Sequence, residues 1–213
     1  MLVDPRIDNP VIAFRPAGHI YTVDGSVTRS TTQVLEDAGI SDFSRVPRDV
    51  LQYAQERGTA VHRAIHYEME DDLDPATVAP EIEPYLVARR KFMIESGFVP
   101  ELIEHIVYCP RFRYIGMLDV KGLYRGADRT ILDWKTGEET ESWGPQLASY
   151  AQACVGPYAC YGYRRLVVQL KKDGTFKLHW YPFSTFRKHF DTFLWALTES
   201  RKKQAIWAQQ AMV

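Results

Sequence analysis

The sequence predicts a mixed α/β fold in which a central mixed sheet is flanked by helices. Apolar residues recur at helical spacing across residues 47–70, and branched and aromatic residues fill three neighbouring segments between about 102 and 135. Helical and strand patterns then alternate to the end of the chain, an order typical of a layered α/β arrangement. With 213 residues, 46% of them hydrophobic, we expect one domain over residues 1–213, with a helical N-terminal portion and a long C-terminal helix.

Gly, Pro and short polar residues mark the boundaries of the predicted elements in the N-terminal half. In chain order we expect two short strands within residues 12–23 around Pro16-Ala17-Gly18, a short helix over 31–38 that Gly39 ends, a helix from Pro47 to about Glu70, and a helix from about Val78 to Ser96. Pro80 and Pro84 leave the start of the last helix open.

The C-terminal half is predicted to supply most of the sheet. In chain order we expect an antiparallel meander of strands at about 102–109, 112–124 and 129–135, a helix from Pro145 to about Cys154, a hairpin of strands 164–171 and 175–181 across Asp173-Gly174, and a closing amphipathic helix with Phe186, Phe190, Phe193, Leu197 and Ile206 on its apolar face.

The overall charge and the cysteine pattern limit which partners, cysteine-based structures and cell compartments fit the chain. A net charge of -1 gives no global attraction to nucleic acid, so any DNA contact must be local. Cys109, Cys154 and Cys160 are odd in number and lack paired spacing, which excludes a disulfide framework and a zinc ribbon. No basic leader and no apolar run of membrane-spanning length is present, so we expect an intracellular, cytoplasmic protein without a membrane partner.

Charged residues interrupt the apolar strand predicted at 129–135. Asp133 and Lys135 are two apart, so in a strand both side chains project from the same face. Asp119 lies on the preceding strand, where a hairpin would bring it close to Asp133. Two carboxylates suit Mg²⁺, and a neighbouring ammonium group can stabilise charge during phosphodiester hydrolysis. A cross-strand ion pair on a solvated face explains Asp133 and Lys135 alone equally well.

Four short segments occur in a characteristic order. They are Gly58-Thr59-Ala60-Val61-His62, Gly116-Met117-Leu118-Asp119, Asp133-Trp134-Lys135-Thr136-Gly137 and Gln146-Leu147-Ala148-Ser149-Tyr150. Together they resemble the RecB-like branch of the PD-(D/E)XK nuclease superfamily, especially compact phage-type exonucleases, over roughly residues 10–195. The resemblance implies a restriction-endonuclease-like core and a metal-dependent DNA exonuclease of recombination, repair or replication, including a phage-encoded one, that acts on single-stranded DNA or free DNA ends.

The resemblance also implies roles for individual residues. Asp119, Asp133 and the Trp134 backbone carbonyl would ligate the metal, and Lys135 would be the catalytic lysine. His62 would complete or border the metal site, and an imidazole ligand makes Mn²⁺ a plausible alternative to Mg²⁺. Gln146 and Tyr150 would share one face of the helix beside the catalytic strand, with Gln146 near the active site and Tyr150 supporting it or touching substrate.

The sequence leaves the roles of two further residues open. Glu104 could supply another carboxylate or be an exposed strand residue, and His66 could lie near the site or bond within its helix. A zinc protease of the H-E-x-x-H type is disfavoured because Arg63 follows His62. Leu118 replaces the proline that names the superfamily, although the branch often has a Gly-x-x-Asp form.

Three points concern partners and cofactors. The three cysteines cannot supply the four-cysteine iron-sulfur cluster of some relatives, so none is expected. Aromatic residues near the site could stack on unpaired bases, although most of them are expected in the core; they are Trp134, Trp143, Tyr150, Tyr161, Tyr163, Trp180 and Tyr181. A homo-oligomer is compatible with the resemblance, and the alternative function is a non-catalytic DNA-binding or assembly module on a nuclease fold.

Overall fold

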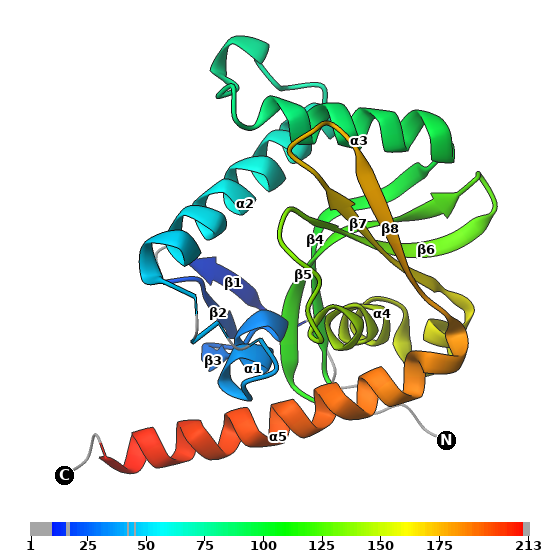
Figure 1. The fold of residues 1–213 in the computed structure, drawn as a ribbon. Helices are drawn as coiled ribbons and strands as arrows, with labels where there is room; N and C mark the ends of the chain where they lie inside the picture. Colours follow the sequence, from blue (N-terminus) through cyan, green and yellow to red (C-terminus); the bar gives the residue numbers. More distant parts are fainter. Residues whose placement is uncertain (1–9, 16–17, 42, 45, 211–213) are drawn as a thin grey trace.

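A five-stranded mixed sheet forms the centre of the protein, with helices on both of its faces, as the computed structural model shows (Figure 1). The structure describes residues 10–15, 18–41, 43–44 and 46–210. Pro16 and Ala17 of the expected first turn lie outside the described residues. The predicted fold class, a mixed sheet flanked by helices, is confirmed.

The central sheet has the strand order β4-β5-β6-β7-β8. Its strands are β4 (Val99–Cys109), β5 (Tyr114–Tyr124), β6 (Asp128–Lys135), β7 (Arg164–Leu170) and β8 (Phe176–Tyr181). The expected meander of β4, β5 and β6 and the β7–β8 hairpin are antiparallel, whereas β6 and β7 run parallel. Because parallel neighbours need a long crossover, α4 (Trp143–Ala159) connects β6 to β7.

Two hydrophobic clusters sandwich this sheet. On one face, α2 (Arg48–Met69) and α3 (Glu83–Ser96) pack against Leu132 and Trp134 of β6. On the other, α1 (Thr31–Asp37), α4 and α5 (Phe186–Gln210) pack against Leu118 and Ile131. In Figure 1, α3 lies above the sheet, α4 is seen end-on below it, and α5 runs along the bottom of the view. Burial from both sides explains the almost continuous apolar run in β6.

A second, smaller sheet lies beside the main one. It consists of β1 (Ile12–Arg15), β2 (Ile20–Val23) and β3 (Ser26–Thr28), paired antiparallel. The first two strands are as predicted, and β3 was missed because it has only three residues after the Asp24-Gly25 turn. Tyr21 and Val23 pack on Ile115 of β5, which attaches the small sheet to the central one.

Several element boundaries differ from the sequence prediction. Helix α3 begins at Glu83 rather than near Val78, since Pro84 is best tolerated in a first helical turn. A 3-10 turn, η1 (Pro75–Thr77), precedes it, and two others, η2 (Cys160–Gly162) and η3 (Phe183–Thr185), flank the last two strands. Strand β4 starts at Val99, earlier than expected, with a register shift between Pro100 and Leu102.

The two C-terminal helices also differ in extent from the prediction. Helix α4 runs on to Ala159 across a kink at Gly156, where φ is 83° and Pro157 follows. Ile206 of α5 was predicted on the apolar face, but it is 51% exposed. Its predicted partners Phe186, Phe190, Phe193 and Leu197 are buried. Among the described residues, no helix combines the length and the apolar character needed to cross a membrane.

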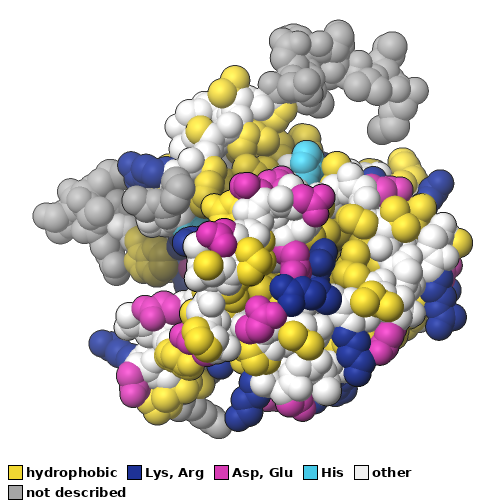
Figure 2. All heavy atoms as spheres, turned by 90° about the horizontal axis from the view of Figure 1, so that it is seen from above, with side chains coloured by type: hydrophobic (Ala, Val, Ile, Leu, Met, Phe, Trp, Pro, Cys, Tyr) yellow, Lys and Arg dark blue, Asp and Glu magenta, His cyan; other side chains and the backbone are white. Residues whose placement is uncertain are grey.

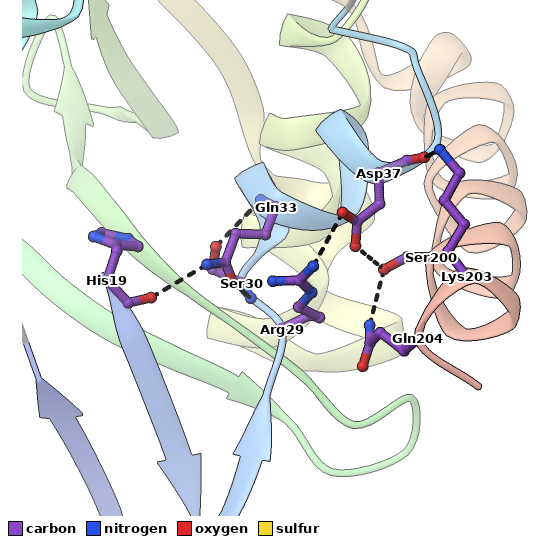
Figure 3. A network of polar contacts seen from close by, with 8 residues as sticks. All are labelled: His19, Arg29, Ser30, Gln33, Asp37, Ser200, Lys203 and Gln204. Carbon is purple, nitrogen blue, oxygen red and sulfur yellow. Dashed lines mark hydrogen bonds and ion pairs between the residues drawn. The ribbon is translucent and has the colours of Figure 1, made fainter. Parts of the chain in front are cut away.

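Helix α1 is held at both ends by polar contacts (Figure 3). Ser30 and Gln33 form a reciprocal capping box at its start. At its end, Asp37 pairs with Arg29 at 3.1 Å and accepts a 2.6 Å hydrogen bond from the Ser200 hydroxyl of α5. These contacts fix the position of α1, which packs against β5 and α4.

Candidate metal centre

The candidate site lies where β5 and β6 separate. Their paired register ends at Val120 and Leu132, one residue short of Asp119 and Asp133. The Trp134 backbone N–H therefore donates to Asp119 Oδ2, at 2.8 Å, instead of joining the β5–β6 ladder. Asp119 is 7% exposed and Asp133 1% exposed, so the solvated ion pair considered from the sequence does not describe this site.

Asp133 and Lys135 contact each other as the two-residue spacing predicts. The Lys135 Nζ lies 2.8 Å from Asp133 Oδ2. Burial by itself would lower the pKa of Lys135, but the carboxylates of Asp133 and Asp119 raise it above its ordinary value. Within the described part of the chain, Asp133 Oδ1 has no hydrogen-bond partner, whereas Oδ2 is ion-paired with Lys135. Because buried carboxylate oxygens are normally satisfied, the unpaired Oδ1 is suited to bind an additional cation.

Asp119 faces α2 as well as β6. Its Oδ2 atom lies 3.4 Å from His62 Nδ1. Burial and the charge of Asp133 together raise the pKa of Asp119 to about 6, against the opposing effects of His62, Lys135 and the Trp134 N–H. A carboxyl group whose charge is disfavoured in this way is stabilised as a carboxylate when a cation binds beside it.

Glu104 joins the same site from β4. One potential ligand atom each from His62, Glu104 and Asp119 lies within 4.8 Å of the others. Burial, followed by the charges of Asp119 and Asp133, raises the pKa of Glu104 to about 8. Its backbone has a φ of 45°, in the left-handed region that side chains other than Gly rarely adopt. Such strain is often found at functional sites, and here it accompanies a carboxylate in the cluster.

The donor set therefore suits a divalent cation. Carboxylate oxygens are the preferred ligands of Mg²⁺, and the His62 imidazole adds a nitrogen that Mn²⁺ accepts more readily. The sequence analysis left Glu104 open, and the structure brings it into the cluster with His62 and Asp119. The one sequence signal for Glu104 is an acidic residue inside an apolar strand.

Gln146 and Tyr150 lie on one side of α4, as their spacing predicts. The Gln146 Nε2 donates to the Tyr150 hydroxyl at 3.0 Å. Burial raises the pKa of Tyr150 well above its ordinary value, and the charges of Asp133 and Asp119 add to the shift. The phenol therefore keeps its proton and acts as a hydrogen-bonding group beside the carboxylates.

Gly116 explains how Tyr150 comes so close to β5. A Cβ atom at Gly116 would lie 2.5 Å from Tyr150 Cε1 and 3.0 Å from Thr31 Oγ1. The Thr31 hydroxyl also hydrogen-bonds the Ile115 carbonyl and the Ser149 hydroxyl. The glycine of the Gly-Met-Leu-Asp segment is thus required by packing, three residues before Asp119.

His66 does not join the cluster. Its Nε2 lies 3.5 Å from Glu70 Oε2 within α2, so the expectation of a contact inside the helix is met. The Trp134 side chain is 1% exposed and packs edge-on against Phe92, with ring centroids 5.6 Å apart. Only the backbone of Trp134 faces the site.

The aromatic residues near the site are mostly unavailable to DNA. Trp134, Trp143, Tyr150 and Tyr163 are buried, so the idea that they stack on bases is wrong for them. The exposed members of that set are Tyr161 and Trp180, at 50% and 38%. Positive and negative side chains are interspersed on the face shown in Figure 2, without a continuous basic surface there.

The comparisons with known proteins show limited similarity. No protein-family model matches the chain, and no curated protein sequence matches it. The solved structures that resemble it include the exonuclease LHK-Exo in complex with dAMP, at 14% identity and a TM-score of 0.40, covering 87% of this chain and 93% of that one. Another is the alkaline exonuclease LHK-Exo from Laribacter hongkongensis, at 13% identity and a TM-score of 0.34, covering 82% and 93%. At these values the likeness carries no argument about activity.

Proposed function

We propose that the chain is a metal-dependent DNA nuclease, with exonuclease action on single-stranded DNA or free DNA ends. The observation that carries the proposal is the convergence of the buried Asp119 and Asp133 with the partly buried Glu104, His62 and Lys135. Three carboxyl groups with a lysine and a histidine cost folding energy unless a cation compensates them. The ordered segments that resemble RecB-like nucleases point to the same chemistry.

The residues have three roles: some would bind the cation, Lys135 would stabilise negative charge, and others would support the site by hydrogen bonding. His62, Glu104, Asp119 and Asp133 would hold the cation, which would polarise the phosphate and lower the pKa of a bound water. Lys135 keeps its positive charge, so it can stabilise developing negative charge and orient the attacking water.

Gln146 and Tyr150 support the site from α4. The amide donates to the phenol oxygen, so the phenol proton is available to another acceptor. The resemblance also assigns the Trp134 carbonyl to the metal, and this assignment stays a prediction. The homo-oligomeric state likewise stays a prediction.

A nuclease assay tests this function. Labelled single-stranded, linear double-stranded and circular DNA are incubated with Mg²⁺, with Mn²⁺ or with EDTA. We expect metal-dependent degradation of linear substrates, with circular DNA resistant, and loss of at least about a thousandfold in rate for Lys135→Ala. Lys172→Ala, in the exposed turn between β7 and β8, is the matched control and should keep full activity.

Two outcomes would contradict the proposal in different ways. Equal cleavage by wild type and Lys135→Ala would refute the site assignment. DNA binding without cleavage under any metal condition would instead favour the non-catalytic DNA-binding module.

A further inference from the structure

Arg57 lies beside the end of β6, the strand that carries Asp133 and Lys135. Arg57 is on α2, five residues before His62, and its Nη2 donates to the Thr136 carbonyl at 3.4 Å. Thr136 directly follows Lys135. A Cβ atom on the neighbouring Gly58 would lie 3.7 Å from Thr136 Oγ1, so α2 approaches the strand end closely at this point.

Two tyrosine rings hold the Arg57 guanidinium group. Its central carbon lies 5.8 Å from the ring centroid of Tyr53 and 5.6 Å from that of Tyr85. Tyr85 is buried, and Tyr53 is 55% exposed. Aromatic rings at these distances attract a cation, so much of the conformational entropy of the arginine side chain is already lost before any ligand binds.

The positive charge of Arg57 is not compensated within the described part of the chain. No Asp or Glu oxygen there lies within ion-pair distance of it, and its buried Nε has no hydrogen-bond partner. By contrast, Arg89 and Arg90 of α3 share Glu68 at 3.0 and 2.5 Å. A partly buried cation without an anion is unfavourable, which indicates that the anion is an external ligand.

Charge counting at the metal centre indicates what that ligand is. Fully ionised Glu104, Asp119 and Asp133 carry three negative charges, and Lys135 with one divalent cation carries three positive charges. The loaded site is then neutral, so it offers no excess positive charge to a polyanionic strand. Arg57 supplies that charge at the rim of the site.

We propose that Arg57 and Tyr53 form a binding subsite for the DNA strand next to the scissile phosphate, an inference that rests on the proposed nuclease function. The guanidinium group binds a neighbouring phosphate, and the exposed Tyr53 ring stacks on a base. Arg57 and His62 are about 7.5 Å apart along the helix axis, at 1.5 Å per residue. At about 3.4 Å per nucleotide, this separation corresponds to about two nucleotides along the strand.

The first experiment measures binding of a fluorescent single-stranded oligonucleotide, in EDTA so that no cleavage occurs, as a function of salt concentration. Arg57→Ala should weaken binding about tenfold and reduce the slope of log K against log salt by about 0.7, the value for one lost phosphate contact on a single strand. Arg57→Lys should retain the slope but bind more weakly, because an ammonium group lacks the planar shape that two rings hold.

The second experiment measures steady-state cleavage of the same oligonucleotide with the preferred metal. Arg57→Ala should raise KM about tenfold and change kcat less than threefold, since its contact is made equally in the ground and transition states. Tyr53→Ala should raise KM by about fivefold or more, whereas Tyr53→Phe, which keeps the ring, should behave as wild type. Melting temperatures establish that each variant folds.

Arg48→Ala is the matched control. Arg48 is exposed on the same helix, nine residues before Arg57 and therefore on the opposite side, so its removal should change neither KM nor the salt slope. An active wild type with an Arg57→Ala variant of unchanged KM and salt slope overturns the subsite and leaves the nuclease function standing. A wild type that never cleaves but loses salt-dependent binding on Arg57→Ala overturns the nuclease function, and with it the place of the subsite beside a scissile phosphate, while leaving Arg57 as a DNA-binding residue.

Discussion

Replacing Glu104 by Gln should stabilise the metal-free protein while weakening its metal binding. Burial, with the charges of Asp119 and Asp133, raises the pKa of Glu104 from 4.5 to about 8. Since the folded-state pKa lies above the unfolded one, the stability that the protonated carboxyl contributes is complete below about pH 4.5. It is lost as the pH rises through about 8.

The size of the stability change follows from the unfolded and folded pKa values of Glu104. The difference between 4.5 and about 8 corresponds to roughly 5 kcal/mol above pH 8, at about 1.36 kcal/mol per pH unit. Glu104 is partly exposed, so water screens part of this cost, and we expect about 2 kcal/mol. For a chain of this length that is a rise of about 4–8 °C in the melting temperature of Glu104→Gln at pH 8.5.

Thermal melts of the EDTA-treated protein at pH 5 and pH 8.5 measure this directly. The melting temperature of Glu104→Gln should exceed that of wild type at pH 8.5 and match it at pH 5. Added Mn²⁺ at a hundredfold excess over its Kd should stabilise wild type by about 2.7 kcal/mol and the variant much less. Glu101→Gln, on the same strand, removes an ion pair with Lys121 and should lower stability by about 1 kcal/mol or less, with no gain at pH 8.5 and an unchanged response to Mn²⁺.

The reasoning would be refuted if Glu104→Gln were less stable than wild type at pH 8.5. It would also be refuted if the difference between the two proteins were the same at both pH values, because the effect would then not come from a titrating carboxyl group.

Three further substitutions test other parts of the structure. Gly116→Ala should destabilise the protein by about 1–3 kcal/mol in urea titrations, because the new methyl group overlaps the Tyr150 ring. Ser200→Ala should cost about 1–3 kcal/mol in thermal melts, because it leaves a carboxylate oxygen of Asp37 without its 2.6 Å hydrogen bond. His62→Ala should weaken Mn²⁺ binding about tenfold or more in calorimetry and Mg²⁺ binding less, since only the imidazole distinguishes the two ions.

Each of these three has its own control. Gly162→Ala should be neutral, because, apart from its chain neighbours, no atom of the described residues lies within 4 Å of the added methyl group. Thr198→Ala removes an exposed hydroxyl from the same helix as Ser200. It should change the free energy of unfolding by less than about 0.5 kcal/mol. Equal losses for both metals in His62→Ala would contradict the preference of the imidazole for Mn²⁺, and unchanged affinity for both would count against His62 as a ligand.

The sequence by itself determined the element types and which residues form the centre of the candidate site. Periods of 3.6 and 2 residues depend only on local backbone geometry, so α2, β5, β6 and α5 were predicted close to their observed ranges. Asp119, Asp133 and Lys135 could be predicted to share a site because two of them lie on one strand face and the third is on the adjoining hairpin strand.

Only the tertiary structure decided which other residues reach the site. Glu104 joins it through a left-handed backbone residue on β4, and Arg57 is placed through the packing of α2 beside the end of β6. Both positions depend on contacts between segments distant in the chain, which no local pattern encodes. Burial was decided in the same way: Trp143 and Tyr150 lie in the core, and Ile206 is exposed. The local sequence pattern thus specified which functional groups the chain carries, and long-range packing specified which of them contact one another.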